Sequence, residues 1–310
     1  MEPWSVSKVP PLLCINNTIP DPRDISENKT HCFQADLNIS AMEENTYIIL
    51  RKIDEGAFGD IFCVQRLKDH KLLAMKQILY RGDISRDPYI TQELNNLSNI
   101  KQEYIIMLVE AIITDKSVNL IMELAENGNL EDLVSGNKLD SDQLSVILKQ
   151  LLTALNFCHK SKIAHRDVTP YNILLTKEMS VRLADFGLSV PCRDSEDKII
   201  LCDDYLGHLH YTAPEVLMKT PYDPLRSDMW SLGIVAYFMI HSTVPFVGEE
   251  EDIVSQQTDD RIVNETISRA HEFNDTLFGI FKVVMKNVLR AIPEKRCQTG
   301  DLLKLINNEA

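Results

Sequence analysis

Two short segments carry side chains that could position a base and a metal ion. The segment HRDVTPYNILL, residues 165–175, places Asp167 five residues before Asn172 and ends in an apolar run typical of a short buried strand. A loop that leads into such a strand can hold a base and a metal ligand. In ADFGLS, residues 184–189, Asp185 follows an apolar run and precedes a Phe-Gly pair, which suits a metal-holding loop. An ordinary turn is the alternative for Asp185.

A second pair of segments could handle phosphate groups. In KIDEGAFGDIFCV, residues 52–64, Gly56 and Gly59 lie between two predicted strands. Such glycines let backbone N–H groups approach phosphate oxygens, although two glycines in a hairpin more often mark a plain turn. Lys76 lies in the apolar strand LAMK, where a lysine needs a partner, and Glu93 on the following helical pattern is the candidate. An edge-strand lysine that faces water is the alternative.

The composition excludes several classes of protein. The chain has 310 residues, 44% of them apolar, which is enough for a substantial core and one or two domains. Its formal net charge of −14 argues against a nucleic-acid or anionic-membrane partner. The seven cysteines form no C-x-x-C pair, which favours reduced thiols. With no visible signal peptide and no apolar stretch long enough to span a bilayer, a cytoplasmic or nuclear protein is expected.

The order of predicted elements divides the chain into two lobes. Residues 1–44 predict a flexible extension because they are rich in Pro, Asn, Asp and Ser. From Tyr47, five short β-rich runs and one helical piece at 87–100 predict a small, mostly antiparallel sheet with one helix. After about Asn129, helical patterns follow at 141–161, 227–240, 276–292 and 299–308. Ser141 or Asp142 is the expected cap of the first of these helices, and the apolar 227–240 segment should be buried at the centre.

In order and spacing, these parts resemble the catalytic domain of a eukaryotic protein kinase. The glycine-rich hairpin, strand lysine, helix glutamate, H-R-D with Asn, D-F-G and TAPE at 212–215 follow each other as in that family. The resemblance covers about Tyr47 to Asn308. Asp228 in SDMWSLG and Arg296 in PEKRC also match, and in the family that arginine pairs with the A-P-E glutamate, here Glu215. The resemblance implies a two-lobed α+β kinase fold, with an N-lobe at 45–124 and a C-lobe at 125–310.

The resemblance also implies ATP and Mg²⁺ as cofactors and assigns roles to matching positions. Asp167 should accept or orient the proton of the attacking hydroxyl, Lys76 should hold the α- and β-phosphates, and Glu93 should steady Lys76. Asn172 and Asp185 should bind Mg²⁺. The remaining nucleotide-binding positions would be Ile53, Asp54, Glu55, Gly56, Ala57, Phe58, Gly59, Asp60, Ile61, Ala74, Met122, Glu123, Ala125 and Leu174. Among these, Ile53, Ile61, Ala74 and Leu174 would sandwich the adenine, Met122 would be the gatekeeper, and Glu123 and Ala125 would offer hinge backbone groups.

A stack of side chains through both lobes is implied as well. Leu97, Leu108, Phe186 and His165 would form it, with Asp228 as its anchor. No polar residue interrupts this stack in the sequence, so a closed, active arrangement is sterically permitted.

Three positions depart from the family pattern. Asp54 stands where the glycine-rich loop usually begins with glycine, which brings a negative charge near the nucleotide unless the side chain points outwards. Thr169 replaces the lysine that helps neutralise the γ-phosphate in serine/threonine kinases, and losing one such contact slows transfer roughly a hundred- to a thousandfold. His208 replaces the Thr or Ser that usually bridges the catalytic aspartate and that lysine. His208 could compensate by offering a donor or a cation to Asp167, or both changes could reflect drift in a weakened enzyme.

The activation loop carries a carboxylate where the family usually has a phosphorylated threonine. Asp204 occupies that position, next to Asp203, and a fixed carboxylate can pair with Arg166 without phosphorylation. We therefore expect any activity to be constitutive at this switch. A solvated acidic loop is the alternative.

The function implied by the resemblance is transfer of the γ-phosphate of ATP to serine or threonine of protein substrates. Tyrosine kinases have an Ala-rich catalytic loop with Arg and a Trp before A-P-E, where this chain has Tyr171 and Tyr211-Thr212. The activation segment is similar to that of the testis-specific serine kinases. Asn129 and Tyr171 occupy positions that are acidic in basophilic relatives, which argues against a strong arginine preference. We expect a cytoplasmic monomer of low activity; the alternative is a pseudokinase scaffold, favoured by Asp54, Thr169 and His208.

Overall fold

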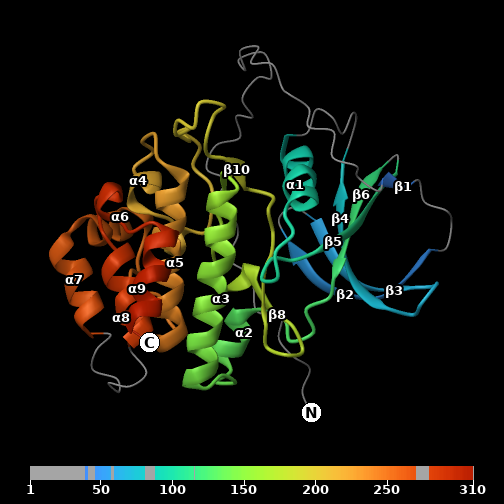
Figure 1. Cartoon of the computed structure of the whole chain (residues 1–310), viewed down its shortest axis with the longest axis horizontal. Coiled ribbons are helices and arrows are strands. Elements are labelled where there is room, and N and C mark those ends of the chain that lie inside the picture. The colour runs from blue at the N-terminus through green and yellow to red at the C-terminus, as the bar shows by residue number, and fades with distance from the viewer. Residues whose placement is uncertain are drawn as a thin grey trace.

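The computed structural model describes residues 39–40, 46–56, 59–80, 88–114, 116–269 and 279–309. One lobe is a six-stranded sheet of order β1-β5-β6-β4-β3-β2 with helix α1 (Pro88–Asn99) beside it, and the other is mostly helical (Figure 1). All strand pairs in this sheet are antiparallel except β1 with β5. The strands are β1 (Ile39–Ser40), β2 (Tyr47–Gly56), β3 (Gly59–Arg66), β4 (Leu72–Leu79), β5 (Leu108–Ile113) and β6 (Ser117–Glu123). The predicted α+β, two-lobed fold is confirmed.

The extension predicted at residues 1–44 lies almost entirely outside the described residues, so its flexibility stays a prediction. Within it, Ile39–Ser40 pair in parallel with Ala111–Ile112 of β5, so this short part contributes a strand. The predicted boundary between the lobes, at residues 124 and 125, likewise stays a prediction. Strand β6 ends at Glu123, and the next helix, α2, begins at Leu130.

Alternation along β4 explains why a lysine can face inward. Successive side chains of a strand point to opposite faces, so Leu73 and Met75 share one face and Lys76 and Ile78 share the other. The first face packs into a small cluster with Val64, whereas Ile78 joins the main core that contains α1. The strand therefore directs Lys76 towards α1.

The helical lobe surrounds one buried helix. Its helices are α2 (Leu130–Ser135), α3 (Ser141–Lys160), α4 (Pro214–Leu217), α5 (Pro224–His241), α6 (Glu250–Thr258), α7 (Asp260–Arg269), α8 (Gly279–Val288) and α9 (Thr299–Glu309). Short strands β7 (Ile163–Ala164) and β10 (Val190–Pro191) pair with each other, as do β8 (Ile173–Leu175) and β9 (Val181–Leu183). Most of α5 is buried, including Trp230 at 0% exposure, which confirms the predicted central helix. No helix in the described ranges is long and apolar enough to cross a membrane.

The cap predicted for α3 was off by one or two residues. Asp140, and neither Ser141 nor Asp142, caps the helix by accepting a hydrogen bond from the Gln143 backbone N–H at 2.8 Å. In turn, the Asp140 backbone N–H donates to Oε1 of Gln143 at 2.9 Å. This reciprocal capping box satisfies two backbone donors, whereas a cap at Ser141 would satisfy one.

The predicted pair between Glu215 and Arg296 is present and buried. The guanidinium donates to both carboxylate oxygens, at 2.6 and 2.7 Å. It also donates to backbone carbonyls of Arg290 and Arg226 and lies 5.0 Å over the ring of Trp230. The pair thus ties α4, at the end of the activation segment, to the segment before α9.

Replacing Arg296 with Met should destabilise the protein by about 3–5 kcal/mol, because it leaves the Glu215 carboxylate buried without its partner. Chemical denaturation of the parent and variant measures this change. Lys304→Met is the matched control, since its pair with Asp301 is exposed. Equal stability of the two variants would contradict the importance of the buried pair.

Candidate functional site

Lys76 lies between two carboxylates that come from different lobes. Its Nζ is 2.7 Å from Oε1 of Glu93 on α1 and 2.8 Å from Oδ1 of Asp185, which follows β9. Lys76 and Glu93 are both buried. Burial opposes the charge on Lys76, but the two carboxylates outweigh it and raise the pKa of the ammonium group, so it stays charged. The predicted Lys76–Glu93 pair is present, and the solvent-facing alternative is wrong.

A chain of hydrogen bonds and ring contacts fixes the segment after Asp185. Asn96 of α1 donates to Oγ of Ser189 at 2.6 Å, and that hydroxyl donates to the Phe186 carbonyl at 2.6 Å. The buried ring of Phe186 meets His165 edge-on, with centroids 4.8 Å apart. Leu97 is buried and Leu108 is partly buried in the same core, as the predicted stack requires.

Asp228 fixes the backbone of the catalytic loop through hydrogen bonds. Its carboxylate, at 0% exposure in α5, accepts the backbone N–H groups of His165 at 2.8 Å and Arg166 at 2.7 Å. It also lies 2.9 Å from Nε2 of His159. Arg166 and Asp185 have left-handed backbones, with φ of 65° and 61°. Such conformations are strained for residues other than glycine and persist where the surrounding contacts impose them.

Asp167 accepts hydrogen bonds from two sides. Nδ2 of Asn172 lies 2.7 Å from its Oδ2 and 2.9 Å from its backbone carbonyl, while Nδ1 of His208 lies 2.8 Å from its Oδ1. The carboxylate is buried but bonded. The structure thus brings Asp167, Asn172 and His208 into one network. Asp185 belongs to the neighbouring network around Lys76.

The apolar positions predicted to bind the nucleotide lie on strands of the N-lobe sheet and on β8. Register pairs Ala74 of β4 with Met122 of β6, and Asp54 of β2 with Ile61 of β3. Ile53 is exposed, and Ile61, Ala74 and Leu174 are half-buried. Met122, the predicted gatekeeper, is buried.

The two hinge positions differ in how their backbones are used. The Glu123 N–H donates to the Met107 carbonyl, and the Glu123 side chain accepts from Met107 N–H and pairs with Arg182. The Ala125 carbonyl accepts a long bond from Gly128 N–H, at 3.3 Å. Within the described ranges the Ala125 N–H has no hydrogen bond.

In the hairpin between β2 and β3, the packing of the chain itself requires glycine at position 59, whether or not a ligand binds there. Gly59 has φ of 147°, and a Cβ there would lie 2.3 Å from the Gln77 carbonyl oxygen. Gly56 pairs with Gly59 across the hairpin, and the predicted positions Ala57 and Phe58 lie outside the described residues. Asp54 and Glu55 are exposed, and Asp60 is half-buried. Lys52 pairs with both Glu55 and Asp60, which offsets the acidic character of this loop.

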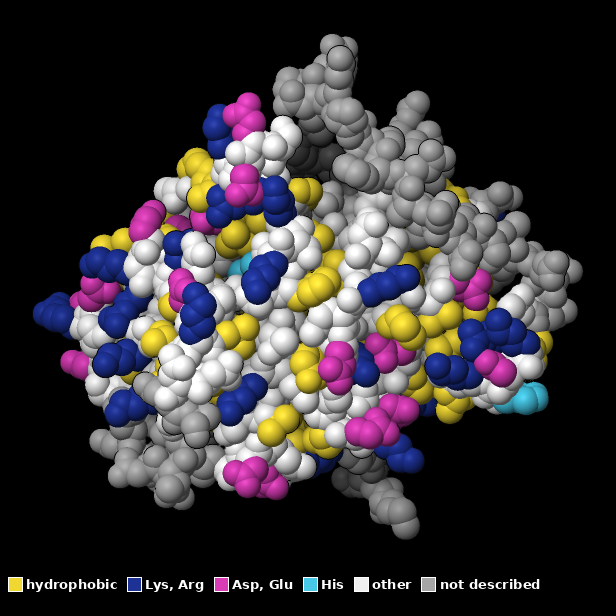
Figure 2. All heavy atoms as spheres, viewed as in Figure 1, with side chains coloured by type: hydrophobic (Ala, Val, Ile, Leu, Met, Phe, Trp, Pro, Cys, Tyr) yellow, Lys and Arg dark blue, Asp and Glu magenta, His cyan; other side chains and the backbone are white. Residues whose placement is uncertain are grey.

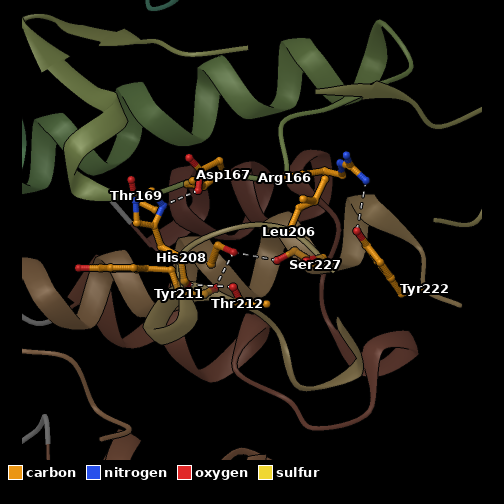
Figure 3. Close-up of a pocket in the computed structure, with 11 residues that line it drawn as sticks. Arg166, Asp167, Thr169, Leu206, His208, Tyr211, Thr212, Tyr222 and Ser227 are labelled. Atoms are coloured by element: carbon orange, nitrogen blue, oxygen red, sulfur yellow. Dashed lines mark hydrogen bonds and ion pairs between the residues drawn. The ribbon is translucent and has the colours of Figure 1, made fainter. Parts of the chain in front are cut away.

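Thr169 is buried at 1% exposure, and its hydroxyl has no hydrogen-bond partner among the described residues. It lines a cavity of about 10 Å³, which is room for about one water, together with Asp167 and His208. Figure 3 shows the His208 ring next to Thr169, with one ring nitrogen directed at the Asp167 carboxylate. A buried unpaired hydroxyl is unfavourable, so the site can accept a further hydrogen-bonding group.

Arg166 is held away from Asp167 by the activation segment. Its guanidinium donates to the Leu188 carbonyl at 2.7 Å and pairs with Asp204 at 2.5 Å. Tyr222 lies 3.4 Å from the same guanidinium and donates to the Asp204 carbonyl at 3.3 Å. The Arg166 side chain is 5% exposed and Asp204 is 43% exposed. The predicted pairing of Asp204 with Arg166 is therefore present.

The donor set around Asp185 suits a hard cation such as Mg²⁺. Oδ1 of Asp185 is used by Lys76 and, more weakly, by Gly187 N–H, while no described residue bonds Oδ2. The amide N–H₂ of Asn172 donates to Asp167, so Oδ1 of Asn172 stays available as an acceptor. Magnesium usually binds one or two such protein oxygens together with water and phosphate oxygens. Within the described ranges, no group of three or more His, Cys, Asp or Glu is arranged to hold a metal.

Some contacts at the site were not predicted from the sequence. The Lys76–Asp185 pair joins residues 109 positions apart, and the His159–Asp228 contact joins residues 69 apart. Tyr222 lies in the PYDP segment and could have been noted there, but its contact with Arg166 depends on how the activation segment folds.

Comparisons with known proteins agree with this geometry. The family model described as protein kinase domain matches residues 47–305. Sperm motility kinase 1 of Mus musculus is 41% identical over 205 residues, which are 64% of this chain and 40% of that protein. Sperm motility kinase 2B of Mus musculus is 34% identical over 201 residues, again 64% of this chain and 40% of the relative.

A yeast relative is similarly distant. The G2-specific protein kinase fin1 of Schizosaccharomyces pombe is 35% identical over 230 residues, 65% of this chain and 31% of that protein. The chain thus spans less than half the length of each of these three relatives. Since the family model covers well over half of the chain, and the Lys76, Asp167 and Asp185 motifs come together in one two-lobed fold, the chain belongs to the eukaryotic protein kinase family.

Proposed function

We propose that this chain is a Mg²⁺- and ATP-dependent kinase that phosphorylates serine or threonine of protein substrates. One observation carries the proposal: Lys76, paired with Glu93, reaches Asp185 at 2.8 Å, while Asn172 reaches Asp167. These are the charged and polar groups that phosphoryl transfer requires for positioning and neutralisation.

Each side chain would have a distinct task. Lys76 would bind the α- and β-phosphates, and Glu93 would hold Lys76 in place. Asp185 and Asn172 would hold Mg²⁺, which when bound neutralises phosphate charge. Asp167 would orient the acceptor hydroxyl of the substrate. In the transfer, the hydroxyl oxygen would bond to the γ-phosphorus, the bond between that phosphorus and the ADP oxygen would break, and the hydroxyl proton would pass to the Asp167 carboxylate.

We propose that the activation segment needs no phosphate at residue 204. Asp204 already supplies the carboxylate that pairs with Arg166, and Tyr205 and Lys219 both contact Glu250 of α6, which helps to fix the segment. The segment also pairs with the chain before α5 through an antiparallel backbone β-bridge between Cys202 and Tyr222.

A scaffold without phosphate transfer is the second candidate. Thr169 favours this candidate because it stands where serine/threonine kinases have a catalytic lysine. Its buried hydroxyl is unpaired, and no lysine is among the described residues that line the cavity beside it. The cytoplasmic location, the monomeric state, the lack of a strong arginine preference and the likeness to testis-specific serine kinases all remain proposals from the sequence.

Nucleotide binding should depend on Asp185. With Mg·ATP at a hundred times its Kd, the parent should gain about 2.7 kcal/mol of stability, measured as a rise in Tm. Asp185→Asn should lose the Mg²⁺-dependent part of this rise, since an amide cannot supply the anionic ligand. Asp203→Asn, an exposed carboxylate, is the control. A magnesium-dependent rise that survives in Asp185→Asn would contradict the assigned metal site.

Phosphate transfer should depend on Asp167 and be limited by Thr169. In a peptide array with labelled Mg·ATP, Asp167→Asn should abolish transfer to serine and threonine, while Thr169→Lys should raise the rate about tenfold or more by adding a cation. Transfer that persists in Asp167→Asn would point to a contaminating kinase. A parent that binds nucleotide but phosphorylates no peptide, even with Thr169→Lys, would leave only the scaffold.

Removing the Asp204 carboxylate should loosen the activation segment. Asp204→Ala should lower the transfer rate about tenfold, because Arg166 loses a charge-assisted bond, and should speed proteolysis between residues 194 and 206. Asp203→Ala should do neither. If Asp204→Ala matches the parent in both assays, the fixed-carboxylate idea is wrong.

A further inference from the structure

The ring of His208 is held in one orientation beside the catalytic loop. Its Nδ1 lies 2.8 Å from Asp167, and the ring stacks on Tyr171 with centroids 6.0 Å apart. The His208 carbonyl accepts the N–H of Tyr211 at 2.9 Å and the hydroxyl of Thr212 at 2.9 Å. The side chain is 12% exposed. This packing directs the imidazole at Asp167.

The backbone before His208 allows this close approach. Gly207 has φ of 117°, and a Cβ on it would lie 3.2 Å from the Thr212 hydroxyl and 3.4 Å from the Arg166 carbonyl. A larger residue would push the segment away from the catalytic loop. Gly207 therefore lets the chain place His208 within hydrogen-bonding distance of Asp167.

His208 is the side chain best placed to bring a positive charge to Asp167. Among the described residues that line the cavity, Arg166 is the other basic side chain, and it is directed to Leu188 and Asp204. Lys76 is engaged by Glu93 and Asp185. Thr169 contributes a hydroxyl and no charge. The second ring nitrogen of His208, Nε2, has no hydrogen bond within the described ranges.

We propose that His208 is a positioning residue that acts through Asp167 and, as an imidazolium, supplies the positive charge that Thr169 lacks. The inference rests on the proposed function. A charged N–H donor to a carboxylate gives a shorter and stronger bond than a neutral donor does. It would fix Asp167 relative to the acceptor hydroxyl and offset negative charge where the phosphoryl group is transferred.

The charges around the ring support its protonation. Burial opposes the charge, but the hydrogen bond that His208 donates to Asp167 and the negative charges of Asp167 and Asp185 outweigh burial and raise the pKa of His208 above its usual value of 6.5. The neighbouring phenols of Tyr171 and Tyr211 have pKa values raised chiefly by burial, so they are neutral near pH 7. Because the folded pKa is raised, the protonated form dominates below it and is lost as pH rises through it. The contribution of His208 to the rate should follow the same course.

The experiment compares kcat and KM between pH 5.5 and 9 for the parent and three variants. His208→Gln keeps a hydrogen-bond donor but cannot carry a charge. It should lower kcat about tenfold at low pH, with little change in KM for ATP, and match the parent at high pH. Thr169→Lys should help most at high pH, where His208 is neutral. Thr169→Lys with His208→Thr should be active and lack the alkaline fall.

Several results would overturn the inference. A purely structural role would lower kcat in His208→Gln by the same factor at every pH. Identical pH profiles of the parent and His208→Gln would also exclude it.

Nuclear magnetic resonance provides a readout that does not need activity. The imidazole of His208 should titrate with a lower pKa in Asp167→Asn than in the parent. An unchanged pKa would show that the two side chains do not interact in solution, which overturns the inference. The parent could show this coupled titration and yet transfer no phosphate at any pH. That result would overturn the proposed function and the catalytic role of the Asp167–His208 pair, and the hydrogen bond between them would then be purely structural.

Discussion

The catalytic loop depends on one buried carboxylate. Asp228, fully enclosed by α5 and its neighbours, accepts two consecutive backbone N–H groups, those of His165 and Arg166. A buried carboxylate without such bonds would be strongly unfavourable, so the loop and the helix fix each other. The left-handed backbone of Arg166 follows from this anchorage, and it turns the side chains of Arg166 and Asp167 towards different partners.

From that anchor, two charge networks extend in opposite directions. On one side Asp167 meets Asn172 and His208, and on the other Arg166 meets Asp204. The two networks share a short piece of backbone, so an ordered activation segment and a fixed Asp167 are physically linked. This arrangement explains why the replacements at positions 169, 204 and 208 are best considered together. His208 and Asp204 each change the charge of one of these two networks, and Thr169 removes a charge from the cavity that Asp167 and His208 line.

On the face viewed in Figure 2, acidic and basic side chains are interspersed over the helical lobe. This face therefore has no large surface patch of a single charge over the helical lobe. The net charge of −14 is therefore not concentrated on that face. The groups that decide the chemistry are the buried ones, where neighbouring charges interact most strongly.

Local motifs predicted the fold and many of the site contacts well. The Lys76–Glu93 pair could be predicted from residue types, whereas the Glu215–Arg296 pair and the approach of Asp204 to Arg166 were implied by the resemblance to protein kinases. The α3 cap was misplaced because Ser141 and Asp142 are also favourable cap residues, whereas the capping box with Gln143 selects Asp140. The direct Lys76–Asp185 ion pair was not predicted because it depends on how the two lobes pack and on the left-handed backbone at Asp185. The His159–Asp228 contact was not predicted because it depends on how α3 packs against α5. Sequence reasoning left the role of His208 open, since a hydrogen bond needs a distance and an orientation as well as a suitable residue.

The most direct test of the central claim is a crystal structure with Mg²⁺ and a non-hydrolysable ATP analogue. The account predicts the metal on oxygens of Asp185 and Asn172, the Lys76 ammonium on the α- and β-phosphates, and the γ-phosphate facing Asp167. A nucleotide bound without the metal at Asp185, or with its γ-phosphate turned away from Asp167, would contradict it.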